Sequence, residues 1–94
     1  MITLIAKVKV KDGKMDEALK ALKEIVPKIK EAEPGCLAYI PHTVRGEDNT
    51  IILYEKYRDK DALKVHSGNL QKSLEKLLPL LEPGMDVKTC YEII

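Results

Sequence analysis

The sequence predicts one α+β domain over residues 1–94, with an antiparallel sheet and the element order β-α-β-β-α-α-β. Three observations support this prediction. Four segments alternate apolar and polar residues with the period of two that strands show, and the stretches between them repeat apolar residues at helical spacing. Pro-Gly pairs at 34–35 and 83–84 mark the ends of helical stretches. A chain of 94 residues, 45% of them hydrophobic, suits a single small globular domain.

The first third of the chain is expected to form a strand and a helix. Residues 2–10 alternate as a strand with one buried face. After a turn at 12–13, apolar residues recur at helical spacing from 15 to about 32. Pro27 lies inside this helix and lacks a backbone donor, so we expect a kink or a break near 24–25.

The middle of the chain is expected to form a hairpin. Residues 36–43 make its first strand, and Pro41, which cannot donate to a ladder, places that strand at a sheet edge or at a bulge. A polar loop over 45–49 leads to the second strand, 50–57, which is rich in β-branched and aromatic residues.

The last third is expected to hold two helices and a strand. Asp59 is a suitable N-cap for a short helix that reaches His66. The Ser-Gly-Asn stretch at 67–69 is expected to interrupt it, and leucines at helical spacing indicate a further helix over 70–81. Alternation over 85–93 indicates the final strand.

This order is the split β-α-β arrangement of the ferredoxin-like fold, with helices on one face of the sheet. The other face needs cover, and it includes Ile5 if the even-numbered residues of the first strand meet the helices. Because an exposed apolar sheet face would be a liability, we expect a homodimer formed sheet against sheet.

Composition excludes several classes of function. Lys and Arg number 16 and Asp and Glu number 15, which leaves no basic footprint for nucleic acid or an acidic membrane. No apolar run could span a bilayer, and the first residues lead straight into a strand without a leader pattern. We therefore expect a cytoplasmic protein with no nucleic-acid or membrane partner. Cys36 and Cys90 lack the spacing of a zinc site; both are interpreted as core residues or free thiols, with a disulfide between chains or a redox role as the alternative.

The best chemical clue is a glutamate on an apolar strand face, followed closely by a histidine. Strand side chains alternate between faces, so one face carries Ile51, Leu53, Glu55 and Tyr57. A carboxylate there is costly to bury unless it is paired or protonated. His66 is close enough in the sequence to fold back toward it. We therefore predict that Glu55, Tyr57 and His66 meet in a water-poor hollow.

Simpler interpretations of these residues stay open. His66 could cap helix carbonyls at the surface, and Glu55 could pair with a lysine at the sheet edge. Tyr57 and Tyr39 could be core aromatics with satisfied hydroxyls, and His42 is expected to be exposed. No glycine-rich phosphate loop, paired-histidine metal motif or serine elbow is present.

Three parts of the chain together resemble the antibiotic biosynthesis monooxygenase superfamily, and most closely its small quinol monooxygenase-like members. The first is the opening strand at 2–6. The second is Ile-Val-Pro at 25–27 with the segment 33–39, which is similar to the family's Glu-Pro-Gly-Cys junction between helix and strand. The third is 53–57 with 62–66, which is similar to the family's Glu-x-Trp/Tyr pattern, short helix and histidine.

The resemblance implies a dimeric α+β barrel that oxidises a small quinol-like or phenolic substrate with O2, without a bound metal or other cofactor. It implies that His66 positions or deprotonates a hydroxyl, and that Glu55 orients the imidazole or relays the proton. Tyr57 would line the pocket and hydrogen-bond within it, while Tyr39 and Asn69 would contact the substrate.

Departures from the family pattern narrow the choice of substrate. Tyr57 stands where many members carry Trp, and residues 5–7 lack the asparagine of haem-degrading members, which argues against haem oxidation. An aromatic content of 4% favours a small substrate over a polycyclic one. Two alternatives remain: a small-molecule isomerase with the same histidine as proton carrier, and a non-catalytic dimeric ligand-binding or stress protein.

Overall fold

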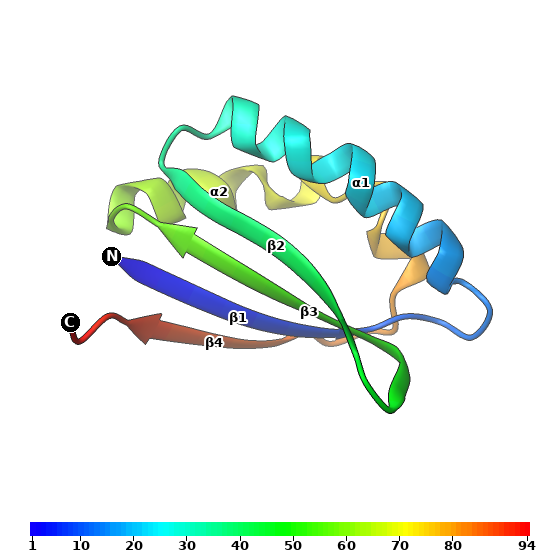
Figure 1. The fold of residues 1–94 in the computed structure, drawn as a ribbon. Helices are drawn as coiled ribbons and strands as arrows, with labels where there is room; N and C mark the ends of the chain where they lie inside the picture. Colours follow the sequence, from blue (N-terminus) through cyan, green and yellow to red (C-terminus); the bar gives the residue numbers. More distant parts are fainter.

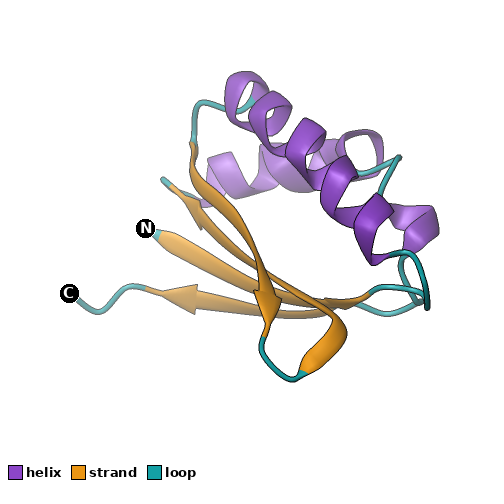
Figure 2. Ribbon diagram, turned by 45° about the vertical axis from the view of Figure 1, so that its right-hand side comes forward, coloured by secondary structure: helices purple, strands orange, loops and turns teal.

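The computed structural model describes residues 1–94 as one four-stranded antiparallel sheet with two α-helices on the same face (Figures 1 and 2). The strands are β1 (Ile2–Lys9), β2 (Cys36–Val44), β3 (Glu47–Tyr57) and β4 (Asp86–Tyr91), in the sheet order β2-β3-β1-β4. The helices are α1 (Met15–Ala32) and α2 (Lys60–Ser73), followed by a 3₁₀ turn, η1 (Leu78–Leu80). The predicted α+β, ferredoxin-like fold class is confirmed.

The two central strands, β1 and β3, divide their side chains between the two faces as the alternation predicts. The even-numbered residues of β1 are buried, whereas Ile5 points to the opposite face and is 39% exposed. In the antiparallel register, Leu4 lies opposite Glu55 and Ala6 opposite Leu53, so the buried face is continuous across both strands. Glu55 therefore enters the interior with apolar neighbours on the same face.

The hairpin between β2 and β3 is tighter than expected. β2 is an edge strand, as Pro41 predicts. The loop expected over 45–49 is a two-residue turn at 45–46, where Gly46 has a φ of +83° that glycine adopts without strain. β3 consequently begins at Glu47, three residues earlier than predicted.

Helix α1 is continuous through Pro27, so the break expected near 24–25 is absent. Pro27 is exposed, on a side where water can satisfy the carbonyl that its missing N–H leaves free. The opposite side carries Leu22, Ile25 and Ile29, which are buried in the core. Burial of this apolar stripe holds the helix together across the proline.

Helix α2 begins as predicted and ends later than predicted. The Asp59 carboxylate accepts a hydrogen bond from the backbone N–H of Ala62 at 2.9 Å, which makes it the N-cap. The helix then continues through 67–69, where an interruption was expected, and the segment 74–81 forms turns and η1 instead of a second α-helix. The order is thus β-α-β-β-α-β with a 3₁₀ turn, and the separate second helix of the prediction is wrong.

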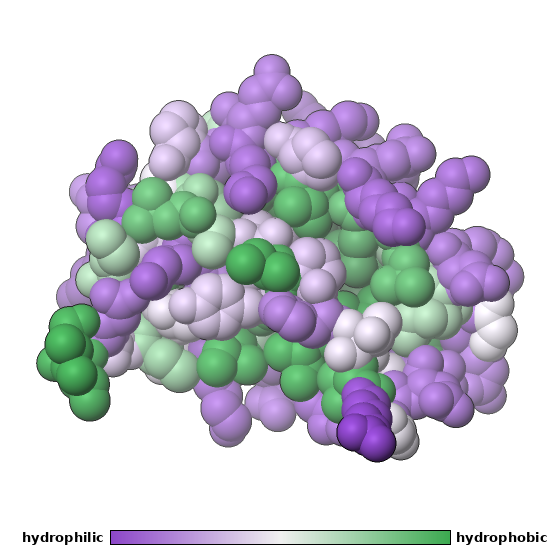
Figure 3. Space-filling view, viewed as in Figure 1, coloured by the Kyte–Doolittle hydropathy of each residue, from purple (hydrophilic) through white to green (hydrophobic).

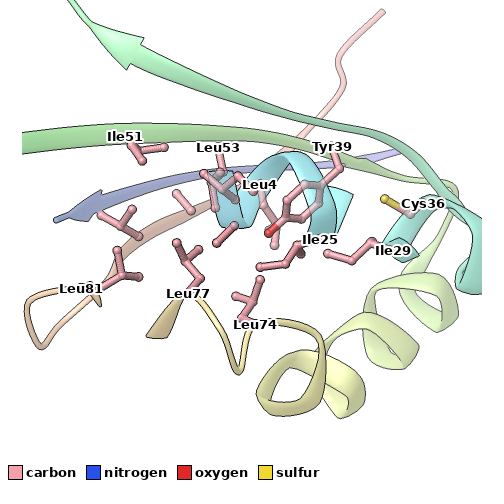
Figure 4. Packing of buried hydrophobic residues seen from close by; sticks show 14 of the residues in the cluster. Leu4, Ile25, Ile29, Cys36, Tyr39, Ile51, Leu53, Leu74, Leu77 and Leu81 are labelled. Carbon is pink, nitrogen blue, oxygen red and sulfur yellow. The ribbon is translucent and has the colours of Figure 1, made fainter. Parts of the chain in front are cut away.

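The core fills the space between the sheet and the helices (Figure 4). Leucines from the segment after α2 face Ile51 and Leu53 of the sheet, and the Tyr39 ring lies beside Ile25 of α1. Charged side chains cover the outer side of α1 (Figure 3). Neither helix combines the length and the apolar character needed to cross a membrane.

Candidate active site

Four buried polar side chains meet between the sheet and α2, and we call them the His66 cluster. Glu55 and Tyr57 come from β3, His66 comes from α2, and Glu33 is the residue that caps the end of α1. None is more than 4% exposed. Burying two carboxylates and an imidazole is costly unless they pair with one another, so their mutual contacts decide whether the arrangement is stable.

The imidazole of His66 lies between the two carboxylates. Its Nδ1 is 3.0 Å from Oε1 of Glu33, and its Nε2 is 3.5 Å from Oε1 of Glu55. The Tyr57 hydroxyl donates a hydrogen bond of 2.7 Å to that same oxygen of Glu55. The chain thus brings together the three residues singled out from the sequence, and it adds a fourth. The contacts form one continuous polar path from Glu33 to Tyr57.

Local structure explains how these side chains come together. Tyr39 of β2 lies opposite Glu55 in the sheet, so both face the helices. On α2, His66 is one turn beyond Ala62 and therefore on the same side of the helix. The helix approaches the α1–β2 junction closely because Gly35 has no side chain: a Cβ at that position would lie 2.5 Å from the Cβ of Ala62.

The buried surroundings change the acidity of the carboxyl and phenol groups. Burial raises the pKa of Glu55 above its ordinary value of 4.5; the Tyr57 hydrogen bond and the charge of His66 oppose this, and Glu33 adds to it. Burial, followed by the hydrogen bond to Glu55, raises the pKa of Tyr57, so its hydroxyl stays protonated as a donor. A carboxylate with a raised pKa beside an imidazole is suited to accepting and returning a proton.

Glu33 is the member of the cluster that the sequence analysis missed. From the sequence it was identified only as the first residue of the junction at 33–39, because it lies 33 residues away in the sequence from the imidazole that it contacts. Its position gives a weak signal, because a carboxylate at a helix C-terminus opposes the helix dipole and needs another reason to be there. Its second oxygen, Oε2, is buried without a hydrogen-bond partner.

Beside the cluster, a groove of about 380 Å³ runs between α1 and α2, and Glu33 lines it. Ile25 and Ile29 form part of its apolar wall. Asn69, predicted as a substrate contact, is exposed and lies on the α2 side of this groove. Tyr39, the other predicted contact, is buried with its ring centroid 5.7 Å from that of His66. The two predicted contacts therefore differ in their surroundings: Asn69 faces the groove, and Tyr39 packs beside the imidazole in the interior.

Neither the cysteines nor the second histidine belongs to the cluster. Cys36 is a buried free thiol next to it, and burial, followed by the charge of Glu33, raises the pKa of this thiol. Cys90 is also free and is partly exposed. His42 is exposed, as predicted, and its Nδ1 lies 2.9 Å from the carbonyl oxygen of Ile40.

Comparisons with known proteins identify the family and the fold. The family described as antibiotic biosynthesis monooxygenase matches residues 1–77. The "Putative monooxygenase YcnE" of Bacillus subtilis (strain 168) is 35% identical over 89 residues, which cover 93% of each chain. A crystal structure from Caulobacter crescentus CB15, described as a "putative antibiotic biosynthesis monooxygenase", is similar with a TM-score of 0.89 and 26% identity, over 99% of this chain and 90% of that one. A solved structure from Nitrosomonas europaea, also described as a "putative antibiotic biosynthesis monooxygenase", has a TM-score of 0.84 at 15% identity, over 100% of both chains, and shows the fold alone.

Proposed function

This chain belongs to the antibiotic biosynthesis monooxygenase family, and on that premise we propose that it oxidises a small quinol-like or phenolic substrate with O2, without a bound cofactor. The His66 cluster is the observation that carries the proposal. An electron-rich phenol can pass an electron to O2 once its hydroxyl has lost a proton. The protein must then accept that proton and keep water away from the anion, and a buried acid–imidazole pair suits both tasks.

The reaction balances with the quinol as the sole reductant. The quinol anion gives one electron to O2, which forms a semiquinone radical and superoxide. These combine through a new C–O bond to a ring hydroperoxide. Cleavage of the O–O bond and loss of the ring proton release water and leave a hydroxyquinone. One oxygen atom enters the product, the other leaves as water, and the quinol supplies all four electrons.

Within this proposal, His66 is the central proton carrier. A proton that arrives at Glu33 can pass through the imidazole to Glu55, because each ring nitrogen faces one carboxylate. Tyr57 keeps Glu55 in place by donating to it, and Tyr39 packs beside the imidazole. Asn69, on the groove side of α2, is a polar contact for the substrate.

We also propose that the protein works as a homodimer through the outer face of its sheet. Ile5 of β1 and Ile40 of β2 both pair with Tyr54 of β3, which forms an apolar row across three strands. Ile5 is 39% and Ile40 is 47% exposed. A shallow hollow of about 410 Å³ on this face is lined by Ile5, Ile52 and Tyr54, among others. A second copy would cover this row.

Light scattering during size-exclusion chromatography tests the dimer. Ile40→Lys places a charge in the row and should yield monomers, whereas Val65→Lys, at an exposed apolar position on α2, should leave the assembly unchanged. A wild-type protein that elutes as a monomer at micromolar concentration would contradict the proposal.

Oxygen consumption with a panel of one-ring and two-ring quinols tests the activity. The wild type should consume one O2 per quinol and release a hydroxyquinone. His66→Ala should remove this activity, and Val65→Ala, at the neighbouring exposed position on α2, should retain it.

Other outcomes favour the alternative functions. Turnover that persists without oxygen and depends on His66 would identify an isomerase. If no quinol is oxidised above the rate in buffer, the oxygenase proposal is wrong.

A further inference from the structure

We propose that the groove between α1 and α2 is the substrate site, and that Oε2 of Glu33 accepts the hydrogen bond of the substrate's hydroxyl group. The identity of the ligand rests on the function proposed above. The location rests on the groove itself, which has a volume of about 380 Å³ and is lined by a member of the His66 cluster. A volume in this range suits a small organic molecule.

Glu33 has one oxygen in use and one free. Oε1 contacts Nδ1 of His66 at 3.0 Å, while Oε2 is buried and has no hydrogen-bond partner. A buried carboxylate oxygen that lacks a donor is costly, and buried polar atoms without partners are rare in folded proteins. Glu33 also lines the groove, so a small rotation of its carboxylate toward the groove would let a ligand hydroxyl supply the missing donor. Glu33 thus connects the groove to the interior of the cluster.

The other groove residues define the rest of the ligand. Ile25 and Ile29 offer an apolar surface against which an aromatic ring can pack. Three lysines and, besides Glu33, two glutamates also line the groove: Lys28, Lys72, Lys76, Glu24 and Glu75. Lys76 has the Glu24 carboxylate 3.9 Å away, whereas Lys28 and Lys72 make no ion pair, so the lysines outnumber these two carboxylates by one. An aromatic ring with a hydroxyl at one end and an anionic substituent at the other would give Glu33 a donor and the two lysines without ion pairs a counter-charge. The ligand class is therefore a small hydroxylated aromatic acid.

This arrangement gives His66 a different role from direct contact with the substrate. Both of its ring nitrogens face carboxylates, and its side chain is 4% exposed. The hydroxyl proton would pass first to Glu33 and then through the imidazole toward Glu55. Glu33 is then the residue that touches the substrate, and His66 acts through it.

Calorimetric titration of the full chain with two probes tests the inference. The first probe, 2,5-dihydroxybenzoate, carries both the hydroxyl donors and an anionic group; the second, 2,5-dimethoxybenzoate, lacks the donors. The wild type should bind the first at least about 10-fold more tightly, and Glu33→Gln should remove most of this preference. Amide shifts of Asn69 and Ser73 in nuclear magnetic resonance spectra should follow the titration.

A second variant keeps the test independent of the folding of Glu33→Gln. Ala32→Leu fills the groove and should weaken both probes, while Glu31→Leu, at an exposed position that does not line the groove, should bind them as the wild type does. Equal affinity for the two probes, no binding at millimolar concentration, or shift changes confined to the outer sheet face would overturn the inference.

Oxygen consumption by the same samples separates this inference from the proposed function. If Ala32→Leu consumes oxygen as fast as the wild type, the groove is not the substrate site and the oxygenase proposal stands. If the wild type distinguishes the two probes but oxidises no quinol, the groove site stands and the proposed chemistry fails.

Discussion

Replacing Gly35 with alanine should weaken the junction that holds α2 against the sheet. The new Cβ would lie 2.5 Å from the Cβ of Ala62 and 3.6 Å from Nη2 of Arg58. Ala62 is 8% exposed and its Cβ has no rotamer to move into, so the helix backbone must shift. Overpacking of this kind costs about 1–3 kcal/mol. In a domain of this size, each kcal/mol corresponds to roughly 4–8 °C in Tm.

Urea denaturation followed by circular dichroism measures this loss, and the chain supplies a matched control. Gly68 lies in the interior of α2 with nothing within 4 Å of an added Cβ, and its φ is not positive. Gly68→Ala should therefore raise the free energy of unfolding by about 0.5–1 kcal/mol. Alanine is therefore expected to lower the free energy of unfolding at Gly35 and to raise it at Gly68, with similar denaturant slopes for both variants.

A double variant identifies the clash as the cause. Combining Gly35→Ala with Ala62→Gly removes the atom that the new Cβ meets, so the combined loss should be smaller than the sum of the two single losses by about 1 kcal/mol or more. Additive losses, or a Gly35→Ala protein as stable as the wild type, would refute the argument from close packing.

Three further predictions concern the cluster and α1. Because burial raises the pKa of Glu55 in the folded state, its contribution to stability is complete below about pH 4.5 and is lost as the pH rises through the folded pKa. In urea titrations, the difference in unfolding free energy between the wild type and Glu55→Gln should therefore decline as the pH rises from about 4.5 through the folded pKa of Glu55. A difference that does not change with pH would contradict this. Tyr57→Phe removes the hydrogen bond that lowers the pKa of Glu55, so the pKa of Glu55 should rise further. With Tyr57→Phe as the background, the stability difference caused by Glu55→Gln should then decline at a higher pH. If the midpoint of that decline does not move, the 2.7 Å contact does not influence Glu55. Pro27→Ala restores a backbone donor inside the continuous α1 and should raise the unfolding free energy by up to about 3 kcal/mol, with a higher Tm by calorimetry; a lower Tm would show that the helix depends on its proline.

Local patterns in the chain were sufficient to predict the fold class and much of the cluster. Alternation along β1 and β3 identified the buried faces of both strands. It also placed Glu55 and Tyr57 together, because side chains two residues apart in a strand point to the same face. Pro41 indicated an edge strand through its missing donor. The capping role of Asp59 also followed from residue type and position. Each of these predictions depends on interactions within a few residues.

Where contacts come from distant parts of the chain, the local patterns were insufficient. Pro27 and Gly68 predicted helix breaks that did not occur, because the cost of such residues is about 1–3 kcal/mol and burial of a helix face can offset it. Glu33 reaches His66 only because α1 and α2 pack at the same end of the sheet, so no spacing rule could connect them. Local strand geometry therefore determines the part of the cluster that β3 supplies, Glu55 and Tyr57. The part at the end of α1, Glu33, joins the cluster only once the two helices are packed together.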